Sequence, residues 1–249
     1  MNKYIESLFS LQDKTAIITG CSRGIGAAIA KGFVEAGASV VGLSSSAYPE
    51  DSTLLSIYRQ CDVRDRSAFE ILCKETVSKN GHIDILVNAA GITQSVSKEF
   101  DKYSTFTNTL EVNLVAAYQC AEIAASNMRK GGSIINVTSI GSLQGFPGNP
   151  GYVASKGGLR LLTKSLAIDF SYKGIRVNNL VPGYTITDMT KKSHDDPKMN
   201  QERLSRMMLK RWGEVEDIAG VAVFLASDAS SYMTGTDVIV DGGWTAKGL

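Results

Sequence analysis

The sequence predicts an α/β fold, a doubly wound parallel sheet with helices on both faces. Short β-branched apolar runs alternate with longer helical patterns, and a glycine-rich turn joins the first run to the first helical stretch. Such alternation is typical of βαβ units, whose right-handed crossovers place helices on both faces of a parallel sheet. The expected strands span residues 15–19, 39–43, 83–87, 133–137, 176–181 and 237–240. The main helical stretches are 24–36, 67–79, 107–130 and 152–172.

The composition fits one globular domain, residues 1–249. Hydrophobic residues make up 43% and charged residues 20% of the chain, which is typical of a soluble protein. The formal net charge is only +1, and no basic stripe stands out, so nucleic acid is not an expected partner. No apolar run approaches the roughly 18 residues that span a membrane. The N-terminus lacks the pattern of a secretory signal.

The cysteines and histidines indicate neither a disulfide framework nor a metal site. Cys21, Cys61, Cys73 and Cys120 are scattered, which favours free thiols in a reducing cytoplasm. His82 lies in a turn before an expected strand and is interpreted as a surface residue. His194 falls in a polar segment, residues 188–211, that is either a lid over a ligand or a solvated surface helix.

The turn after the first expected strand has the properties of a phosphate-binding loop. Thr19 is followed by Gly20, Cys21, Ser22, Arg23, Gly24, Ile25 and Gly26, and an alanine-rich helical pattern comes next. Glycines let the backbone turn tightly, and the helix N-terminus presents unpaired N–H groups to an anion. An ordinary strand–helix turn is the alternative, and the strand–turn–helix context favours the phosphate loop.

Tyr152 and Lys156 are four positions apart on an expected helix, so their side chains project from the same face. Moving a hydride to a carbonyl requires a proton for the resulting alkoxide. A phenol has a pKa near 10, and a neighbouring ammonium favours its ionised form. The pair therefore suits general acid–base catalysis, although a surface tyrosine with a solvated lysine has the same spacing.

Together these motifs resemble the short-chain dehydrogenase/reductase family. The spacing T-G-x-x-x-G-x-G, the segment Asn88-Ala89-Ala90-Gly91 and the pair Pro182-Gly183 match family motifs in order, from about residue 11 to residue 244. The resemblance implies a Rossmann-type fold and a catalytic tetrad of Asn113, Ser139, Tyr152 and Lys156.

The resemblance also implies roles for individual residues. Ser139 would donate to the substrate oxygen; strand alternation turns Thr138 to the opposite face. Asn113 would hold a water that links Lys156 to solvent, and Lys156 would also hold the nicotinamide ribose. Asp62 and Val63 would lie beside the adenine. The loop from Pro182 would contact the nicotinamide through the backbone at Thr185, where relatives have Val or Ile, and the phosphates through Thr187.

NADP(H) is the expected cofactor, with NAD(H) as the alternative. An acidic residue at the end of the second strand would select NAD by binding the ribose hydroxyls, but Ser44, Ser45 and Ser46 stand there. Arg23 in the glycine turn is placed to reach a 2′-phosphate. If Arg23 faced solvent instead, a small polar pocket would also admit NAD.

Three functions are compatible with these residues. The first is an NADP-dependent oxidoreductase for a small polar substrate, a sugar or sugar acid, because the C-terminal part resembles dehydrogenases of gluconate and deoxygluconate type. The second is a 3-oxoacyl-(acyl-carrier-protein) reductase, with Arg129, Lys130 and Lys173 as a docking patch. The third is a non-catalytic nucleotide-sensing regulator, which the complete tetrad disfavours. The resemblance implies a homotetramer, with a flat interface along residues 112–125.

Overall fold

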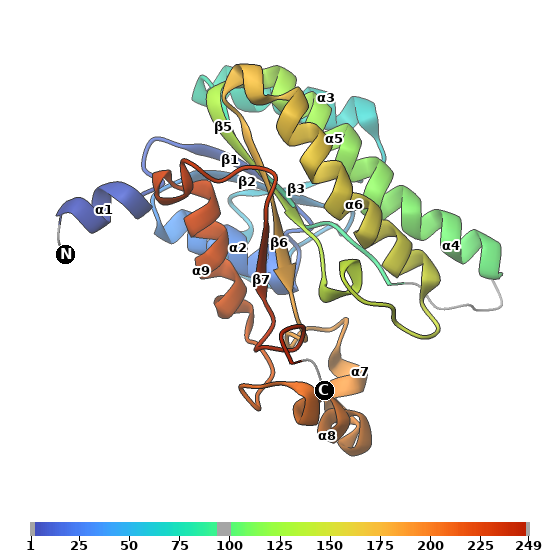
Figure 1. Cartoon of the computed structure of the whole chain (residues 1–249). Coiled ribbons are helices and arrows are strands. Elements are labelled where there is room, and N and C mark those ends of the chain that lie inside the picture. Colours follow the sequence, from blue (N-terminus) through green and yellow to red (C-terminus); the bar gives the residue numbers. More distant parts are fainter. Residues whose placement is uncertain (1–2, 94–100, 248–249) are drawn as a thin grey trace.

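One parallel sheet organises the residues that the structure, a computed structural model, describes, which are 3–93 and 101–247. Within them, seven strands lie in the order β3-β2-β1-β4-β5-β6-β7 (Figure 1). The order reverses between β1 and β4, which in this architecture opens a ligand crevice at the carboxyl ends of the strands. The strands are β1 (Thr15–Thr19), β2 (Ser39–Ser44), β3 (Tyr58–Gln60), β4 (Ile83–Asn88), β5 (Met128–Val137), β6 (Arg176–Pro182) and β7 (Asp237–Val240).

Helices cover both faces of the sheet. α2 and α9 pack together on one face, and α3, α5 and α6 cover the other (Figure 1). The helices are α1 (Lys3–Phe9), α2 (Gly24–Glu35), α3 (Arg66–Asn80), α4 (Lys102–Leu110), α5 (Ala116–Asn127), α6 (Pro150–Asp169), α7 (Lys191–Asp195), α8 (Pro197–Arg206) and α9 (Val215–Ala226). The doubly wound α/β architecture predicted from the sequence is confirmed.

Alternate residues of a strand enter two separate cores. Ile18 of β1 packs with Phe33 of α2 in one core, whereas its neighbour Ile17 packs with Phe69 of α3 in the other. All four residues are fully buried. Burial on both faces explains why β1 is an unbroken apolar run rather than an alternation of polar and apolar residues.

The expected long helix over residues 107–130 differs from the structure. The helical segment begins at Lys102, where the Asp101 carboxylate accepts hydrogen bonds from the first free amides and caps the helix. One π-helical turn, Glu111–Val115, separates α4 from α5. α5 ends at Asn127, because Met128 already pairs with Ile83 as the start of β5.

The segment 188–211 carries α7 and α8, which lie beyond the carboxyl ends of β6 and β7 (Figure 1). Each is short, and neither has a fully buried residue.

No helix in the described ranges is long and apolar enough to cross a membrane. The four cysteines are free and buried.

Candidate active site

Glycines shape the turn between β1 and α2. Gly20 has a φ of +71°, and an added Cβ there would lie 2.6 Å from the backbone nitrogen of Ala90. An added Cβ at Gly26 would lie 2.2 Å from the carbonyl oxygen of Gly20. Side chains are therefore excluded, and α2 begins at Gly24 without a side-chain cap among the described residues. Its free N–H groups fit a dinucleotide pyrophosphate.

The loop after β6 lies beside the glycine turn. The Gly183 amide donates to Val240 at 2.9 Å, and an added Cβ at Gly183 would lie 2.6 Å from the Cα of Asp241. The Thr187 methyl group lies 3.5 Å from the position of a Cβ on Gly24. The structure thus brings together two predicted phosphate-binding segments that are more than 150 residues apart in sequence.

Thr185 and Ile25 point into the protein rather than into the crevice. Thr185 is 3% exposed, and its hydroxyl lies 3.4 Å from the carbonyl oxygen of Gly183. Ile25 packs against the core beneath α2 and α9. The contact of Thr185 with the nicotinamide through its backbone stays a prediction.

The end of β2 carries hydroxyl groups. Ser44 Oγ donates to Ser22 Oγ at 3.2 Å, so the last residue of β2 and the glycine turn are linked. The Ser45 carbonyl accepts a hydrogen bond from Gln60 at 3.1 Å. Two hydroxyls therefore stand where an NAD-selecting carboxylate would stand.

Arg23 lies between two carboxylates. Its Nη1 is 3.4 Å from Glu50, and its Nε is 3.5 Å from Asp188 at the start of the segment that carries α7 and α8. Its side chain remains 56% exposed. Arg23 is therefore neither free in solvent nor already fixed on a ribose site.

Asp62 and Val63 follow β3. Arg64 binds the Asp62 carboxylate, with Nη2 at 2.7 Å, and this contact holds the pKa of Asp62 below its usual range. Val63 is buried. The predicted contact of Asp62 with an adenine competes with this ion pair.

The segment after β4 is anchored by Thr19. Its hydroxyl accepts hydrogen bonds from the amides of Ala89 and Ala90, each at 3.1 Å. Asn88 is buried and donates to the carbonyl of Ala117 at 3.1 Å and to Asn136 at 2.9 Å. The Asn88 side chain therefore ties β4 to α5 and β5 beneath the site.

Ser139 and Tyr152 meet at the carboxyl edge of the sheet. Ser139 follows β5, Tyr152 lies in the first turn of α6, and the Ser139 side chain is near enough to the phenol to lower its pKa. The Gly141 amide donates to Ser139 Oγ at 3.0 Å, which fixes the hydroxyl. Thr138 instead directs its hydroxyl to the Leu180 carbonyl at 3.2 Å, so its side chain faces β6. Ser139 and Thr138 thus direct their hydroxyls to different partners, in agreement with the alternation expected from the sequence.

Lys156 is 5% exposed and donates from Nζ to the Val137 carbonyl at 2.8 Å. Burial lowers the pKa of Lys156 to about 8. The ammonium lies 5.9 Å from the centre of the Tyr152 ring. A position for Cβ on Gly91 would be 3.4 Å from Nζ, so a side chain there would crowd the lysine.

The pKa of Tyr152 is raised, first because the phenol is buried, while the hydrogen bond from Ser139 acts in the opposite direction. The sequence reasoning expected the lysine to dominate. Burial of the phenol, which favours the neutral form, is instead the largest influence on its pKa.

Asn113 occupies the π-helical turn. Its Nδ2 donates to the Ile92 carbonyl at 2.9 Å and to Ser155 Oγ at 3.1 Å, and its Oδ1 accepts from the Ile92 amide at 2.8 Å. Ser155 in turn donates to the Tyr152 carbonyl at 2.7 Å. Asn113 therefore holds the segment after β4 against α6, and Oδ1 retains one acceptor position. The water relay stays a prediction.

Sequence reasoning missed Ser155 and Gly42. Ser155 was overlooked because a serine one residue before the motif lysine carries no signal of its own. Gly42 lies within β2, and an added Cβ there would lie 2.3 Å from Cys21 Sγ. A glycine inside an apolar strand pattern is the signal that indicates such a close approach.

The two histidines lie apart from the tetrad. His82 Nε2 lies 3.1 Å from the Asp13 carbonyl and 3.1 Å from Asp84, on the amino-end side of β4. His194 stacks edge-on against Trp212 at 5.2 Å between ring centres. Across residues 3–93 and 101–247, no group of three potential ligands could hold a metal.

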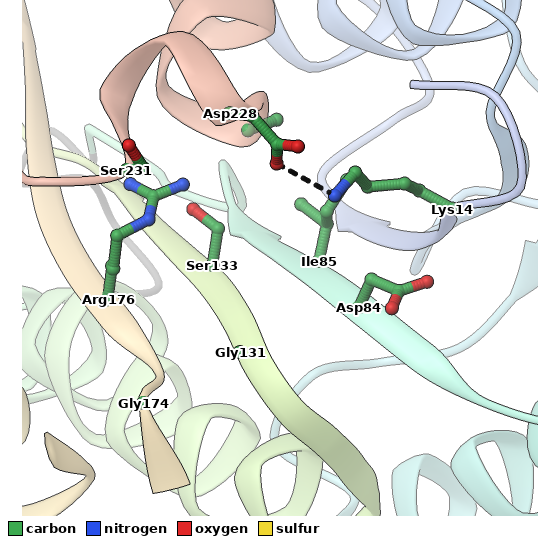
Figure 2. A pocket seen from close by; sticks show the side chains of 10 residues that line it. Lys14, Asp84, Ile85, Gly131, Ser133, Gly174, Arg176, Asp228 and Ser231 are labelled. Atoms are coloured by element: carbon green, nitrogen blue, oxygen red, sulfur yellow. Dashed lines mark hydrogen bonds and ion pairs between the residues drawn. The ribbon is translucent and has the colours of Figure 1, made fainter. Parts of the chain in front are cut away.

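A cavity of about 220 Å³ lies near the amino ends of the strands, away from the tetrad (Figure 2). Lys14 pairs with Asp228 at 3.2 Å across it, and Arg176 donates to the Leu225 carbonyl at 2.9 Å. Its charges are largely paired within the protein. In this architecture, ligands bind at the carboxyl ends instead.

Comparison with known proteins identifies the family. The family model described as enoyl-(acyl carrier protein) reductase matches residues 20–245. The chain belongs to the short-chain dehydrogenase/reductase family. It is 40% identical to a 2-dehydro-3-deoxy-D-gluconate 5-dehydrogenase from Bacillus subtilis, over 98% of this chain and 99% of the relative. It is 36% identical to a 3-oxoacyl-(acyl-carrier-protein) reductase from Staphylococcus epidermidis, over 93% and 98%.

Structural similarity agrees with this membership. A gluconate 5-dehydrogenase from Burkholderia cenocepacia, solved with NADP and tartrate, superposes with a TM-score of 0.90 at 32% identity, covering 97% of this chain and 99% of that one. Membership in the short-chain dehydrogenase/reductase family confirms an NAD(P)-dependent oxidoreductase acting on CH–OH groups. The reading as a non-catalytic regulator is thereby set aside.

Proposed function

We propose that this member of the short-chain dehydrogenase/reductase family interconverts a secondary alcohol and a ketone on a sugar acid, with NADP(H). The similarity to sugar-acid dehydrogenases over nearly the full length of the chain carries this proposal. The tartrate in the related structure also joins hydroxyl groups to carboxylates.

Three residues favour NADP over NAD. Ser22 and Ser44 offer hydroxyls where an acidic residue would repel a 2′-phosphate. Arg23 can turn towards that phosphate, because exposed ion pairs such as its contacts with Glu50 and Asp188 contribute only about 0–1 kcal/mol each. A phosphate that accepts two charge-assisted hydrogen bonds would hold the guanidinium more strongly.

The tetrad residues divide the proton chemistry. The glycine turn would hold the pyrophosphate of a nicotinamide cofactor, and that cofactor would supply the hydride chemistry beside the tetrad. Ser139 donates a hydrogen bond to the substrate oxygen and stabilises charge that develops there. Tyr152 gives a proton to that oxygen or takes one from it, and Lys156, with a pKa of about 8, stabilises the transient phenolate. Asn113 positions the segment beside Lys156.

We further propose that α7 and α8 act as a lid over the crevice. The ion pair between Arg23 and Asp188 links this segment to the glycine turn, so a cofactor that draws Arg23 away would release the link. A homotetramer remains our expectation; in residues 112–125, Val115 and Tyr118 are the exposed large apolar residues of the proposed interface.

The alternative, a reductase of 3-oxoacyl groups on acyl carrier protein, finds less support. Of the three basic residues proposed as a docking patch, Arg129 is bound to Asp84. Lys173 donates to the carbonyl of Ala125 at 2.8 Å, which leaves Lys130. A similar relative with this activity keeps it as the second candidate.

Nicotinamide absorbance during turnover tests these proposals. We expect activity with gluconate or a deoxygluconate-type acid, and little with 3-oxoacyl thioesters or uncharged polyols. Tyr152→Phe should lower kcat by about 10²- to 10⁴-fold with NADP binding retained, because it removes only the ionisable hydroxyl. Full activity of this variant, or at least a tenfold preference for NAD by the wild type, would show the reasoning to be wrong.

A further inference from the structure

An aromatic cluster lies next to the catalytic serine and is not used by the tetrad. Tyr184 follows the Pro182-Gly183 pair and meets three other rings: Trp244 at 4.8 Å, Trp212 at 5.3 Å and Phe146 at 6.3 Å between ring centres. The two tryptophans are almost fully buried. The cluster is therefore tightly packed, and it lies on the side of the molecule that carries α7 and α8; we call it the aromatic floor.

Arg203 of α8 lies on this floor. Its guanidinium carbon is 4.9 Å from the centre of the Tyr184 ring, and the side chain is only 22% exposed. The Nε atom is buried and has no hydrogen-bond partner in the described part of the chain. Glu202 approaches Nη1 at 3.7 Å, too far for a strong hydrogen bond.

A continuous series of contacts connects Arg203 with the reacting groups. The Gly141 amide is bonded to Ser139 Oγ, and a Cβ on Gly141 would lie 3.0 Å from the Phe146 ring. Phe146 packs against Tyr184, and the guanidinium of Arg203 lies over the Tyr184 ring. Packed side chains thus connect the guanidinium with the Ser139 hydroxyl.

The partly exposed guanidinium of Arg203 makes no hydrogen bond within the described part of the chain, and a largely desolvated cation is unfavourable until it finds an acceptor. The planar guanidinium matches a carboxylate, which can accept two hydrogen bonds, and the stacking on Tyr184 fixes the plane in advance. A sugar acid has its carboxylate at one end and a reactive secondary hydroxyl several carbons away. We infer that Arg203, held on the Tyr184 ring, binds the carboxylate of the substrate while its hydroxyl meets Ser139 and Tyr152; this rests on the proposed function.

Two substrates that differ only in charge test this inference: gluconate and gluconamide, in which a neutral amide replaces the carboxylate. With NADP⁺, Arg203→Gln should lower kcat/KM for gluconate by about 10- to 100-fold, mostly through KM, because a charge-assisted contact is lost. The value for gluconamide should change by less than about threefold. Arg203→Lys should fall between, because it keeps the charge without the planar fork.

Arg206→Gln is the matched control. Arg206 lies on the same helix over Trp244 at 5.7 Å, and its side chain is 62% exposed. This variant should alter neither substrate by more than about threefold, since an exposed charge contributes little. Thermal melting of all variants shows whether the aromatic floor remains folded.

Equal losses with both substrates, or unchanged kinetics with gluconate, would overturn the role of Arg203 and leave the proposed function intact. If the wild type turns over no sugar acid, the proposed function itself fails. In that case the binding of gluconate to the NADP⁺ complex, measured by quenching of tryptophan fluorescence, tests the role of Arg203. Saturable binding that Arg203→Gln abolishes supports it, and absence of binding by the wild type overturns it.

Discussion

The buried Lys156 is expected to make the free energy of unfolding of this protein vary with pH in the alkaline range. Its side chain is 5% exposed, and burial lowers its pKa from 10.5 to about 8. This difference in pKa means that burial destabilises the charged form of Lys156 in the folded protein by about 3 kcal/mol. The unfolded chain, in which the lysine is solvated, has no such cost. Below pH 8 the folded protein carries the full penalty.

Raising the pH from 8 towards 10.5 relieves this penalty. In that window the unfolded chain binds the proton and the folded protein does not, so the contribution of Lys156 to the free energy of unfolding rises with pH. Lys156→Met removes the charge but also the hydrogen bond to Val137, worth about 1 kcal/mol. At pH 7 the variant should therefore be more stable than the wild type by about 2 kcal/mol.

Urea denaturation at pH 7, 8, 9 and 10, at one protein concentration, measures this difference. The advantage of Lys156→Met should shrink as the pH rises and disappear near pH 10. Lys164→Met, at an exposed lysine on the same helix, provides the control and should show no such trend. A difference between wild type and Lys156→Met that stays constant with pH, or grows, would refute the buried-charge reasoning.

Other predictions concern the hydroxyl pair, the glycine turn and the cofactor. Ser139→Ala should lower kcat about 10²-fold or more, whereas Thr138→Val should stay within about threefold and lose about 1 kcal/mol of stability; equal kcat losses would contradict their different orientations. Gly26→Ala should weaken NADP binding at least about tenfold in a fluorescence titration, because its Cβ would overlap the Gly20 carbonyl. Unchanged binding would count against a phosphate-binding role of the glycine turn. Arg23→Gln should lower kcat/KM for NADP about tenfold and leave NAD within about threefold, and parallel losses would rule out a 2′-phosphate contact.

Local patterns predicted many residues of the candidate site. The strand–turn–helix context of Gly20 to Gly26 and the four-residue spacing of Tyr152 and Lys156 depend on short-range geometry, which sequence periodicity reports directly. The orientation of Ser139 against Thr138 also followed from strand alternation, and the hydrogen bond of Thr138 to Leu180 agrees with it.

Contacts between distant segments lay beyond those patterns. Only the folded chain brings Arg23 to Asp188 and Arg203 to the ring of Tyr184. The low pKa of Lys156 likewise arises from burial by distant segments. The sequence by itself determined the architecture and the catalytic group types, because both arise from local periodicity and motif spacing. Tertiary structure decided how burial shifts the pKa values of Tyr152 and Lys156, because desolvation and charge depend on every element packed around a group.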